Sequence, residues 1–425
     1  MKITQFCALF LTNTGLVYPS KASTQVGYDG LQRKTKTMST TIFISAGEAS
    51  GEHYGALVID ALKRQLDAKG QTASFFGMGG DRMAAAGLDC VVRSEEMAVM
   101  GLTEVVRHLP RIYREFRRLK QSIRNRRPSV AVLIDFPEIH FRLAKELHRL
   151  GVPVIYFVSP QLWAWKKRRI RLVQRYIDRM LVIFPFEEPF YRERGVQAEF
   201  VGHPLAELPL PAISRDEFAS TYLLDPQATW IGLLPGSRPK EIRDHLPEIL
   251  QAAQVWRDDF QFLIPLAPTL NSAQRKEVQQ ILKNHGAGLT VRLVKDARAV
   301  LHHSRASVVA SGTATVEAAL IGNPFIVVYH VSALTYAIAK RMVKVPYVAM
   351  ANLIAGKRVV PELIQSEFTV ENIVRELEPL LLDGPPRQSM MEELARIRGL
   401  LGKRPAGGVI EQVAAVTLET IRQDL

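Results

Sequence analysis

The sequence has few cysteines, no long apolar run and fewer acidic than basic residues. Its 425 residues include only Cys7 and Cys90. Two cysteines are too few for a disulfide framework and favour a reducing compartment. No apolar stretch approaches the roughly 20 residues that a membrane-spanning helix needs, so an integral membrane protein is not expected. The 55 Lys and Arg against 42 Asp and Glu give a net charge of +13. This balance suits nucleic acid, an anionic membrane surface or phosphorylated substrates.

The first 37 residues differ from the rest. Their apolar stretch at 6–11 is broken at once by Thr12, Asn13 and Thr14. A signal peptide needs about 7–15 uninterrupted apolar residues, so a cleaved signal is the less favoured alternative. We interpret residues 1–37 as a disordered extension or the product of a misassigned start codon, with Met38 beginning the folded chain.

From Met38 onward, short apolar segments alternate with helical patterns. The expected strands lie at 41–45, 74–77, 130–135, 154–158, 179–184, 230–234, 262–266, 289–294, 307–310 and 325–329. Strands separated by helices of this length predict parallel sheets wrapped by helices. Pro-rich residues 208–211 indicate a linker. The predicted fold class is therefore α/β, with two Rossmann-like domains at 38–207 and 212–384. Helices at 385–425 can pack on either domain or on a dimer partner.

The stretch at 308–322 combines a buried strand, a small-residue turn and a helix. The turn is Ser311-Gly312-Thr313, and the helix ends at Gly322. Its first N–H groups and its dipole suit a phosphate, and Gly312 lets that phosphate approach the backbone. Glu317, about one turn further on, can accept hydrogen bonds from the two hydroxyls of a ribose. A plain strand-to-helix turn, capped by Ser311 or Thr313, is the alternative.

A second small-residue turn follows the strand expected at 230–234. Gly236 and Ser237 allow close backbone approach, and Arg238 can hold a diphosphate through two parallel hydrogen bonds. Because both turns fall at strand ends of one predicted sheet, together they predict a nucleoside-diphosphate site.

The first domain carries carboxylates at two strand ends. Ser45 and Gly47 belong to a small-residue turn in which Glu48 and Glu52 are spaced to share a helix face. Glu48 is placed to contact a sugar hydroxyl, although exposed glutamates at a tight helix–sheet contact are an equal alternative.

Asp135 and Glu138 follow the strand expected at 130–135. A partly desolvated carboxylate at a strand end can act as a general base. Asp135 is the first candidate for that role and Glu138 the second. The alternative is that Asp135 caps the following helix.

Two segments combine basic and apolar side chains. Trp163 and Trp165 precede a basic cluster at 166–169, which fits phosphate or lipid contact as well as a solvated helix face. In 105–124, apolar residues repeat at steps of three and four between seven Lys and Arg residues. Such a stripe can lie in an anionic lipid interface. A core-packed helix with a basic outer face, begun or kinked at Pro110, is an equal alternative.

Seven ordered motifs resemble the lipid-A-disaccharide synthases. They are S-A-G-E-A-S-G-E at 45–52, M-G-L-T-E-V at 100–105, I-D-F-P-E at 134–138, V-S-P-Q-L-W-A-W at 158–165, L-L-P-G-S-R at 233–238, A-S-G-T-A-T-V-E at 310–317 and N-L-I-A-G at 352–356. The resemblance covers the chain from about Met38 to its end and leaves out residues 1–37. It implies an inverting glycosyltransferase of the two-Rossmann-domain (GT-B) architecture.

The resemblance also implies the reaction. Such an enzyme joins UDP-2,3-diacylglucosamine to 2,3-diacylglucosamine 1-phosphate, forms a β-1,6-linked disaccharide of lipid A and releases UDP. Asp135 would take the proton from the acceptor hydroxyl. The expected UDP-binding residues are Gly236, Ser237, Arg238, Ser311, Gly312, Thr313, Glu317 and Asn352. The expected residues on the acceptor and lipid side are Ser45, Gly47, Glu48, Glu52, Met100, Trp163 and Trp165.

The remaining expectations concern metals, partners and location. The sequence contains no Asp-x-Asp pair of the kind that holds a nucleotide-bound metal, so no metal is expected, and Arg238 with a helix dipole would replace it. The resemblance implies a homodimer, peripheral on the cytoplasmic face of the inner membrane, with no nucleic-acid partner. Two alternatives stay open. One is another UDP-sugar enzyme of the same fold, such as a UDP-N-acetylglucosamine epimerase or a cell-wall glycosyltransferase. The other is a non-catalytic nucleotide-binding module at the membrane surface.

Overall fold

The computed structural model describes most of the chain from residue 40 onward. The described ranges are 40–97, 102–164, 167–267, 270–332, 336, 345–402 and 407–421. The extension predicted at 1–37 lies outside them.

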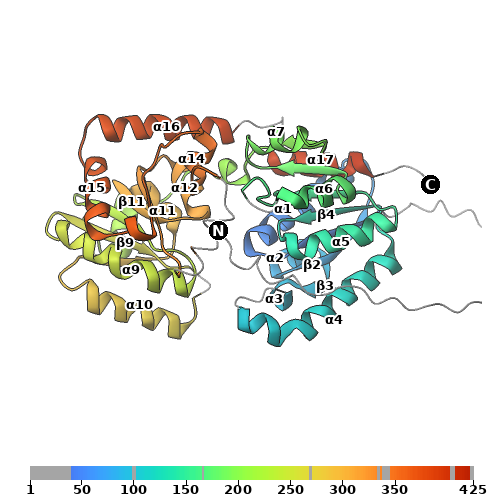
Figure 1. Ribbon diagram of the computed structural model, residues 1–425, viewed down its shortest axis with the longest axis horizontal. Helices are drawn as coiled ribbons and strands as arrows, with labels where there is room; N and C mark the ends of the chain where they lie inside the picture. Colours follow the sequence, from blue (N-terminus) through green and yellow to red (C-terminus); the bar gives the residue numbers. More distant parts are fainter. Residues whose placement is uncertain are drawn as a thin grey trace, which may run out of the picture. The chain divides into compact units, whose positions relative to one another are not determined.

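The N-terminal sheet has seven strands in the order β3-β2-β1-β4-β5-β6-β7 (Figure 1). Its strands are β1 (Thr40–Ala46), β2 (Ala73–Gly79), β3 (Leu88–Arg93), β4 (Val130–Ile134), β5 (Val154–Phe157), β6 (Arg179–Val182) and β7 (Ala198–Phe200). The helices along this part of the chain are α1 (Ala49–Asp67), α2 (Asp81–Ala85), α3 (Ser94–Met97), α4 (Leu102–Arg126), α5 (Pro137–Arg149), α6 (Ile170–Tyr176) and α7 (Glu187–Arg192). Helix α1 contacts β1, β2 and β4, while α5 contacts β4 and β5.

The C-terminal sheet has six strands in the order β10-β9-β8-β11-β12-β13. Its strands are β8 (Thr229–Leu234), β9 (Phe260–Pro265), β10 (Val291–Val294), β11 (Ala306–Ala310), β12 (Phe325–Tyr329) and β13 (Glu362–Ile364). The helices are α8 (Arg215–Tyr222), α9 (Pro239–Ala253), α10 (Ser272–His285), α11 (Ala297–His303), α12 (Thr313–Ile321), α14 (Met350–Ala355), α15 (Val370–Leu381), α16 (Pro385–Leu401) and α17 (Val409–Thr420). Neighbouring strands pair in parallel from β3 to β5 in the first sheet and throughout the second.

The central strands form because their residues are apolar on both faces. Every residue of β4, β11 and β12 is buried. A parallel sheet covered on both faces needs such continuous apolar strands rather than alternating ones. The predicted α/β class with two parallel-sheet, Rossmann-like domains is confirmed.

The differences from the sequence-based expectation lie at the sheet edges and strand ends. Strands β3, β7 and β13 were not expected; β7 and β13 have three residues each, and β3 alternates buried with more exposed positions. The strand expected at 130–135 ends one residue earlier, because Asp135 leaves the extended conformation with a φ of 52°.

The chain divides into two compact units. Among the described residues, 40–160, 172–180 and 413–421 form one unit, and those within 161–171 and 181–412 form the other. This division leaves the linker expected at 208–211 inside the second unit. It also assigns most of α17 to the first unit, whereas α16 belongs to the second.

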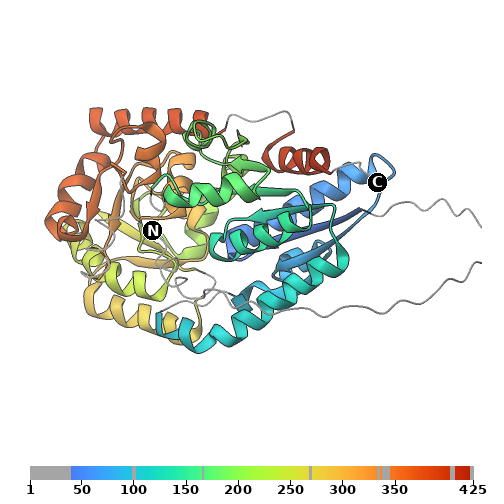
Figure 2. The ribbon, with the colours of Figure 1, turned by 45° about the vertical axis from the view of Figure 1, so that its right-hand side comes forward.

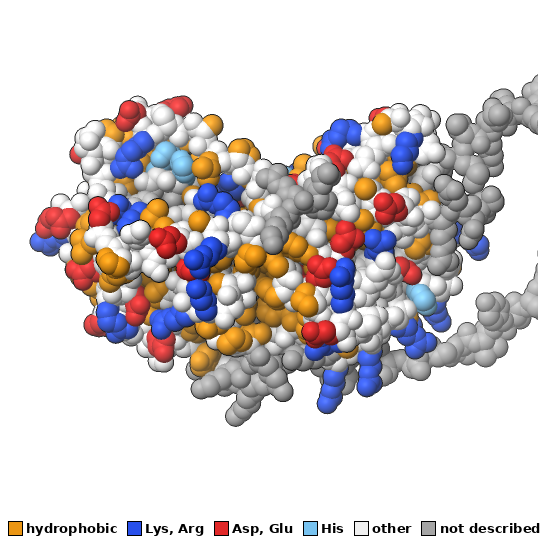
Figure 3. All heavy atoms as spheres, turned by 90° about the horizontal axis from the view of Figure 1, so that it is seen from above, with side chains coloured by type: hydrophobic (Ala, Val, Ile, Leu, Met, Phe, Trp, Pro, Cys, Tyr) orange, Lys and Arg blue, Asp and Glu red, His pale blue; other side chains and the backbone are white. Residues whose placement is uncertain are grey.

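Pro110 lies inside helix α4 and does not begin it. Figure 2 shows this helix as one continuous ribbon. It contacts β3 and α5. Within the described part of the chain, no helix combines the length and apolar character required to cross a membrane. On the face shown in Figure 3, Lys and Arg side chains are dispersed among acidic and apolar ones.

Candidate active site

Each sheet has one point where the strand order reverses. In the N-terminal sheet the reversal falls between β1 and β4, and in the C-terminal sheet it falls between β8 and β11. In open parallel sheets, ligands bind beyond the carboxyl ends of the strands at such a switch point. Gly47 and Glu48 follow β1, and Asp135 follows β4; residues 235–238 follow β8, and residues 311–313 follow β11. Both predicted groups of polar residues therefore lie at switch points.

The loop after β8 is shaped by Gly236 and closed by Glu241. Gly236 has a φ of 119°, and a Cβ added to it would lie 2.7 Å from the Glu241 Cβ. The Glu241 carboxylate accepts hydrogen bonds from the backbone N–H groups of Ser237 at 3.1 Å and Arg238 at 3.2 Å. It also accepts one from the Arg238 guanidinium at 2.9 Å. The Glu241 carboxylate thus already occupies the donors at the N-terminus of α9, and the predicted diphosphate contact of Gly236, Ser237 and Arg238 stays a prediction.

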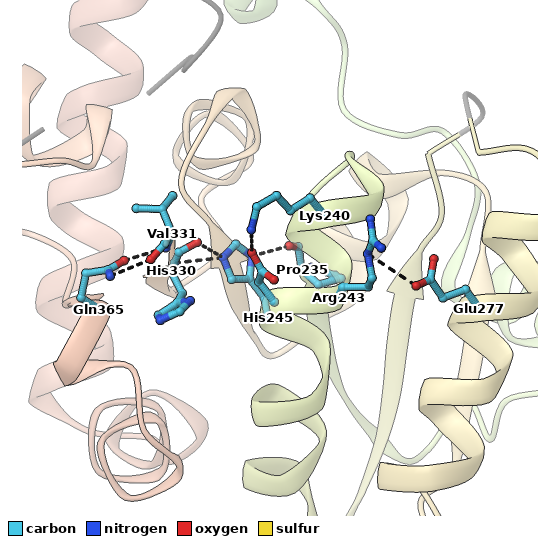
Figure 4. A network of polar contacts seen from close by, with 9 residues as sticks. Pro235, Lys240, Arg243, His245, Glu277, His330, Val331 and Gln365 are labelled. Carbon is cyan, nitrogen blue, oxygen red and sulfur yellow. Dashed lines mark hydrogen bonds and ion pairs between the residues drawn. The ribbon is translucent and has the colours of Figure 1, made fainter. Parts of the chain in front are cut away.

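His245 links this loop to the end of β12, two strands away in the sheet (Figure 4). Its Nδ1–H donates to the Pro235 carbonyl at 2.7 Å, and its Nε2 accepts from the His330 backbone N–H at 3.0 Å. Burial lowers the pKa of His245, although its hydrogen bonds with the backbone of Pro235 and His330 oppose this effect. His245 is fully buried and neutral in this arrangement, so it holds the ends of β8 and β12 at a set separation.

The turn after β11 is open. Gly312 is exposed, and a Cβ built on it would meet no atom within 4 Å. Gly312 is the N-cap of α12, whose first turn contains no acidic residue. The Thr315 hydroxyl donates back to the Gly312 carbonyl at 2.7 Å. The N-terminal N–H groups of α12 therefore face space that an anionic group can enter, and Thr313 is exposed beside them.

Glu317 lies one turn further along α12 and is half-buried. Burial raises the pKa of Glu317; Arg298 opposes this shift and Asp296 adds to it. A carboxylate of this kind is available as an acceptor for hydroxyl groups, as a ribose contact requires.

The side chain of Asn352, on α14, forms hydrogen bonds within the protein. Its amide nitrogen donates to the Val360 carbonyl and to Glu362, and its oxygen accepts from the backbone N–H groups of Val359 and Val360. The side chain is fully buried. Its predicted contact with UDP stays a prediction, and in this conformation Asn352 instead fixes the segment that leads into β13.

At the switch point of the N-terminal sheet, Gly47 is in close contact with Phe136. A Cβ added to Gly47 would lie 2.3 Å from the Phe136 ring. Glu48 follows as the N-cap residue of α1 and is half-buried. The absence of a side chain at Gly47 therefore lets the loops after β1 and β4 come together.

Asp135 and Phe136 have left-handed backbone conformations, with φ values of 52° and 50°. Phe136, not Asp135, is the N-cap residue of α5. The Asp135 N–H donates to the Phe157 carbonyl at 3.0 Å. Asp135 and Glu138 are both half-buried, and Glu138 lies in the first turn of α5. Both candidates for the base thus lie beside the same switch point.

Two of the predicted acceptor-side residues have internal partners. Ser45 is fully buried, and its hydroxyl lies 2.8 Å from His140 Nε2. Glu52 accepts a hydrogen bond from the Arg82 backbone N–H at 2.9 Å, at the start of α2. Their contacts with an acceptor stay predictions.

Trp163 is nearly buried in an apolar cluster. Its indole N–H donates to Glu187 at 3.0 Å, and its ring meets Phe186 edge to face. Met350 and Leu353 pack against the same cluster. Met100 and Trp165, the other two predicted lipid-side residues, lie outside the described residues.

Three residues at these switch points were not singled out from the sequence. His140, Tyr156 and His245 each bond the backbone of a strand-end loop. The sequence did offer one signal, because His140 lies only five residues after Asp135 on a helix whose neighbouring residues are apolar.

Two solved structures show the same fold. A UDP-GlcNAc 2-epimerase from Neisseria meningitidis superposes with a TM-score of 0.57 at 14% identity, covering 90% of this chain and 100% of that one. The calicheamicin glycosyltransferase superposes with a TM-score of 0.56 at 17% identity, covering 91% and 100%. At these identities the likeness shows the fold alone, which is that of the GT-B glycosyltransferases and the related epimerases.

The family follows from sequence similarity. Residues 42–404 match the family model described as lipid-A-disaccharide synthetase. The lipid-A-disaccharide synthase of Acidobacterium capsulatum is 59% identical over 391 residues, covering 90% of this chain and 96% of that protein. The same enzyme of Koribacter versatilis is 50% identical over 361 residues, covering 84% and 92%. This chain belongs to the lipid-A-disaccharide synthase family and is a glycosyltransferase of lipid A biosynthesis.

Proposed function

We propose that the chain transfers 2,3-diacylglucosamine from UDP-2,3-diacylglucosamine to the 6-hydroxyl of 2,3-diacylglucosamine 1-phosphate. The products are a β-1,6-linked disaccharide 1-phosphate and UDP. The observation that carries this proposal is the pairing of β8 with β11, because it sets the turn at 235–238 beside the turn at 311–313. Family membership supports the choice of sugar substrates.

Asp135 is the proposed general base. It accepts the proton of the acceptor 6-hydroxyl while that oxygen attacks the anomeric carbon, and the bond to the UDP phosphate breaks on the opposite face. Attack from the face opposite the leaving group inverts the anomeric configuration. Glu138 is the second candidate for the base, and Glu48 is placed to contact a sugar hydroxyl.

Arg238 and the N-terminus of α12 are the proposed stabilisers of the departing diphosphate. Arg238 is 41% exposed and forms an ion pair with Glu241. Its guanidinium can leave this carboxylate and bind a diphosphate instead. The α12 dipole supplies further positive potential. We propose that these groups replace a metal ion, so that the transfer rate stays unchanged in excess chelator. A rate that falls in chelator and returns with Mg²⁺ would contradict this part of the proposal.

Glu317 is proposed to bind the ribose hydroxyls. Glu317 lies one turn after Thr313 on α12, about 6 Å along the helix axis from the proposed phosphate-binding turn. Glu317→Gln keeps an acceptor oxygen but weakens it, so we expect a higher KM for the UDP-sugar with kcat little changed.

The segment 105–124 is proposed to contact an anionic membrane surface. The apolar side chains of Leu119 and Ile123 are buried in the N-terminal unit and so do not reach lipid. The outward face carries Arg114 and Arg118, which are 74% and 63% exposed. Both pair with Glu115, which reduces their net field. The described part of the helix therefore supports an electrostatic rather than an inserted contact.

Vesicle binding tests the membrane contact. We expect the protein to bind vesicles that contain anionic lipid and to leave neutral ones. Arg114→Gln with Arg118→Gln should weaken this binding, at roughly 1 kcal/mol per charge. Arg257→Gln with Arg375→Gln removes the same charge from exposed positions on the other unit. If both double variants bind anionic vesicles equally weakly, binding depends on the net charge of the protein and not on this helix.

A homodimer, peripheral on the cytoplasmic face of the inner membrane, completes the proposal. Sedimentation equilibrium measures the mass of the full chain in solution. A single species of twice the chain mass supports the dimer, and a concentration-independent monomer contradicts it.

UDP release tests the reaction itself. The protein should release UDP from UDP-2,3-diacylglucosamine only when 2,3-diacylglucosamine 1-phosphate is present. Non-acylated UDP-glucosamine should be a poor donor. Release without the acceptor would indicate a hydrolase or an epimerase, the activity of the N. meningitidis structural neighbour.

A further inference from the structure

The main-chain carbonyl of Asp135 is held by two side chains. His140 Nδ1 and the Tyr156 hydroxyl each lie 2.5 Å from this oxygen. A carbonyl oxygen has two lone pairs, so two donors fill its capacity. His140 comes from α5, and Tyr156 comes from β5. Two separate elements thus converge on one atom of the residue that is proposed to be the base.

These contacts define the proton positions on His140. A carbonyl oxygen can only accept, so Nδ1 carries the hydrogen. Nε2 is then an acceptor, and the Ser45 hydroxyl donates to it at 2.8 Å. Burial lowers the pKa of His140 to about 4, so the ring is neutral at pH 7. Ser45, at the end of β1, is therefore linked through His140 to the residue that follows β4.

The Ser45–His140 pair resembles a nucleophile with its base, but it cannot act as one. The Ser45 side chain is fully buried, so no substrate can reach its oxygen. The third member of the chain is a carbonyl oxygen, which cannot stabilise an imidazolium as a carboxylate does. The network consequently acts on residue 135 itself.

Residue 135 needs such support because its conformation is costly. Asp135 and Phe136 both have positive φ, and such residues cost about 1–3 kcal/mol each unless their surroundings hold them. The surroundings here include the two bonds to the carbonyl, the Asp135 N–H bond to Phe157 and the close contact between Phe136 and Gly47. A left-handed residue points its side chain in a different direction from an extended one, so this backbone sets where the carboxylate lies.

We propose that Ser45, His140 and Tyr156 are positioning residues, which aim the Asp135 carboxylate by holding the backbone of residues 135–136 in its left-handed conformation. The inference rests on the proposed role of Asp135 as the base. It predicts that loss of a donor to the carbonyl lowers kcat, because small misplacements of a catalytic group are costly.

Tyr156→Phe removes one donor and leaves the ring in place. We expect kcat for acceptor-dependent UDP release to fall about 10- to 100-fold, with KM for both substrates within about threefold. The same substitution in an Asp135→Asn background should cause no further loss, since the bond acts only through the carboxylate. Losses that multiply in the double variant, or an unchanged kcat in Tyr156→Phe, would overturn the proposal.

Two substitutions of His140 separate positioning from packing. Asn places its amide donor near the position of Nδ1, whereas Gln reaches toward Ser45 and loses the bond to Asp135. We expect His140→Asn to retain more kcat than His140→Gln, although Asn fills less of the buried space. A purely structural role predicts the reverse order, because the larger cavity is the more destabilising.

Ser45→Ala has a matched control in Ser307→Ala. Both serines are fully buried in strands, and Ser307 lies in the other sheet with no hydrogen-bond partner for its hydroxyl among the described residues. We expect only Ser45→Ala to lower kcat, while the midpoints of thermal unfolding change little in either variant. Equal kcat in the two variants would remove Ser45 from the network.

A crystal structure of Tyr156→Phe separates this inference from the proposed function. Residues 135–136 should have left the left-handed conformation or show two conformers. Residues that stay in place would overturn the positioning role whatever the activity. Wild-type protein that releases no UDP in the presence of acceptor would overturn the proposed function instead.

Discussion

The two switch points of the molecule differ in their residues and in their backbone conformation. After β8 and β11, the turns contain Gly236 and Gly312, exposed helix N-termini and an arginine. After β4, the chain adopts left-handed conformations without glycine, at Asp135 and Phe136. The first arrangement leaves the donors at the N-terminus of α12 open to an anionic group, while Glu241 occupies those at the N-terminus of α9. The second fixes one carboxylate in direction.

The difference shows how strain is used. Glycine adopts positive φ without steric cost, so the positive φ of Gly236 needs no compensating bonds. At Asp135 the residue must carry a carboxylate, so glycine is unusable and the cost is offset by His140 and Tyr156. Bonds from distant elements therefore compensate at Asp135 for a strain that glycine avoids at Gly236.

Both sites share one device, a buried neutral histidine bonded to a strand-end carbonyl. His140 bonds Asp135, and His245 bonds Pro235. Burial lowers the pKa of both rings, which keeps them uncharged donors at neutral pH. Substitutions at the two sites and a change of pH test this comparison.

Arg238→Ala should give the largest effect on the diphosphate side. Loss of one charge-stabilising donor costs about 10²–10³ in rate. Arg243→Ala is the matched control, since Arg243 lies on the same helix, is 55% exposed and pairs with Glu277. Steady-state kcat with saturating substrates measures the effect. Near wild-type turnover in Arg238→Ala would remove it from the mechanism.

Acidification should destabilise the protein through its buried histidines. Burial lowers the pKa of His140 from 6.5 to about 4. A group whose pKa is depressed in the folded state contributes stability that is present above pH 6.5 and is lost as the pH falls toward 4. The full loss for one such group is about 3 kcal/mol.

Urea unfolding at pH 7 and at pH 4.5 measures this loss. The difference in the free energy of unfolding between the two pH values should be smaller in His140→Asn than in the wild type. His302→Asn, at an exposed position, is the control. An equal difference in the wild type and His140→Asn would show that His140 does not titrate as proposed.

Gly312→Ala and Gly47→Ala should separate the two kinds of site. A Cβ at Gly312 meets no protein atom within 4 Å, so this variant should fold normally. We expect it to bind UDP about tenfold more weakly, equivalent to about 1.4 kcal/mol, because the methyl group occupies ligand space. Gly47→Ala should instead lower thermal stability, since its Cβ would collide with Phe136. Calorimetry of UDP binding and of unfolding distinguishes them; unchanged UDP affinity in Gly312→Ala would place the diphosphate elsewhere.

The sequence predicted the parts of the molecule that are determined locally. The apolar runs of β4, β11 and β12 are long enough to identify buried strands, and the small residues after them mark strand-end turns. The short edge strands β7 and β13 carry too little apolar pattern to be recognised.

The features that could not be predicted from the sequence depend on contacts between residues that are far apart along the chain. Nothing in the sequence around Asp135 indicates a left-handed backbone, because neither Asp135 nor Phe136 is glycine. Tyr156 lies 21 residues away from Asp135 along the chain, and only the fold brings its hydroxyl to the carbonyl. Asn352 was predicted as a ligand from its motif, while its observed bonds are all internal.

The most direct test of this account compares Asp135→Asn with Glu138→Gln in acceptor-dependent UDP release. Asparagine keeps the size of the side chain but cannot accept the proton, so kcat should fall about 10²–10⁴-fold, the usual contribution of a general base. Glu138→Gln should lose far less. A large loss in Glu138→Gln with Asp135→Asn near wild type would contradict the account, because the strained and supported residue would then not be the base.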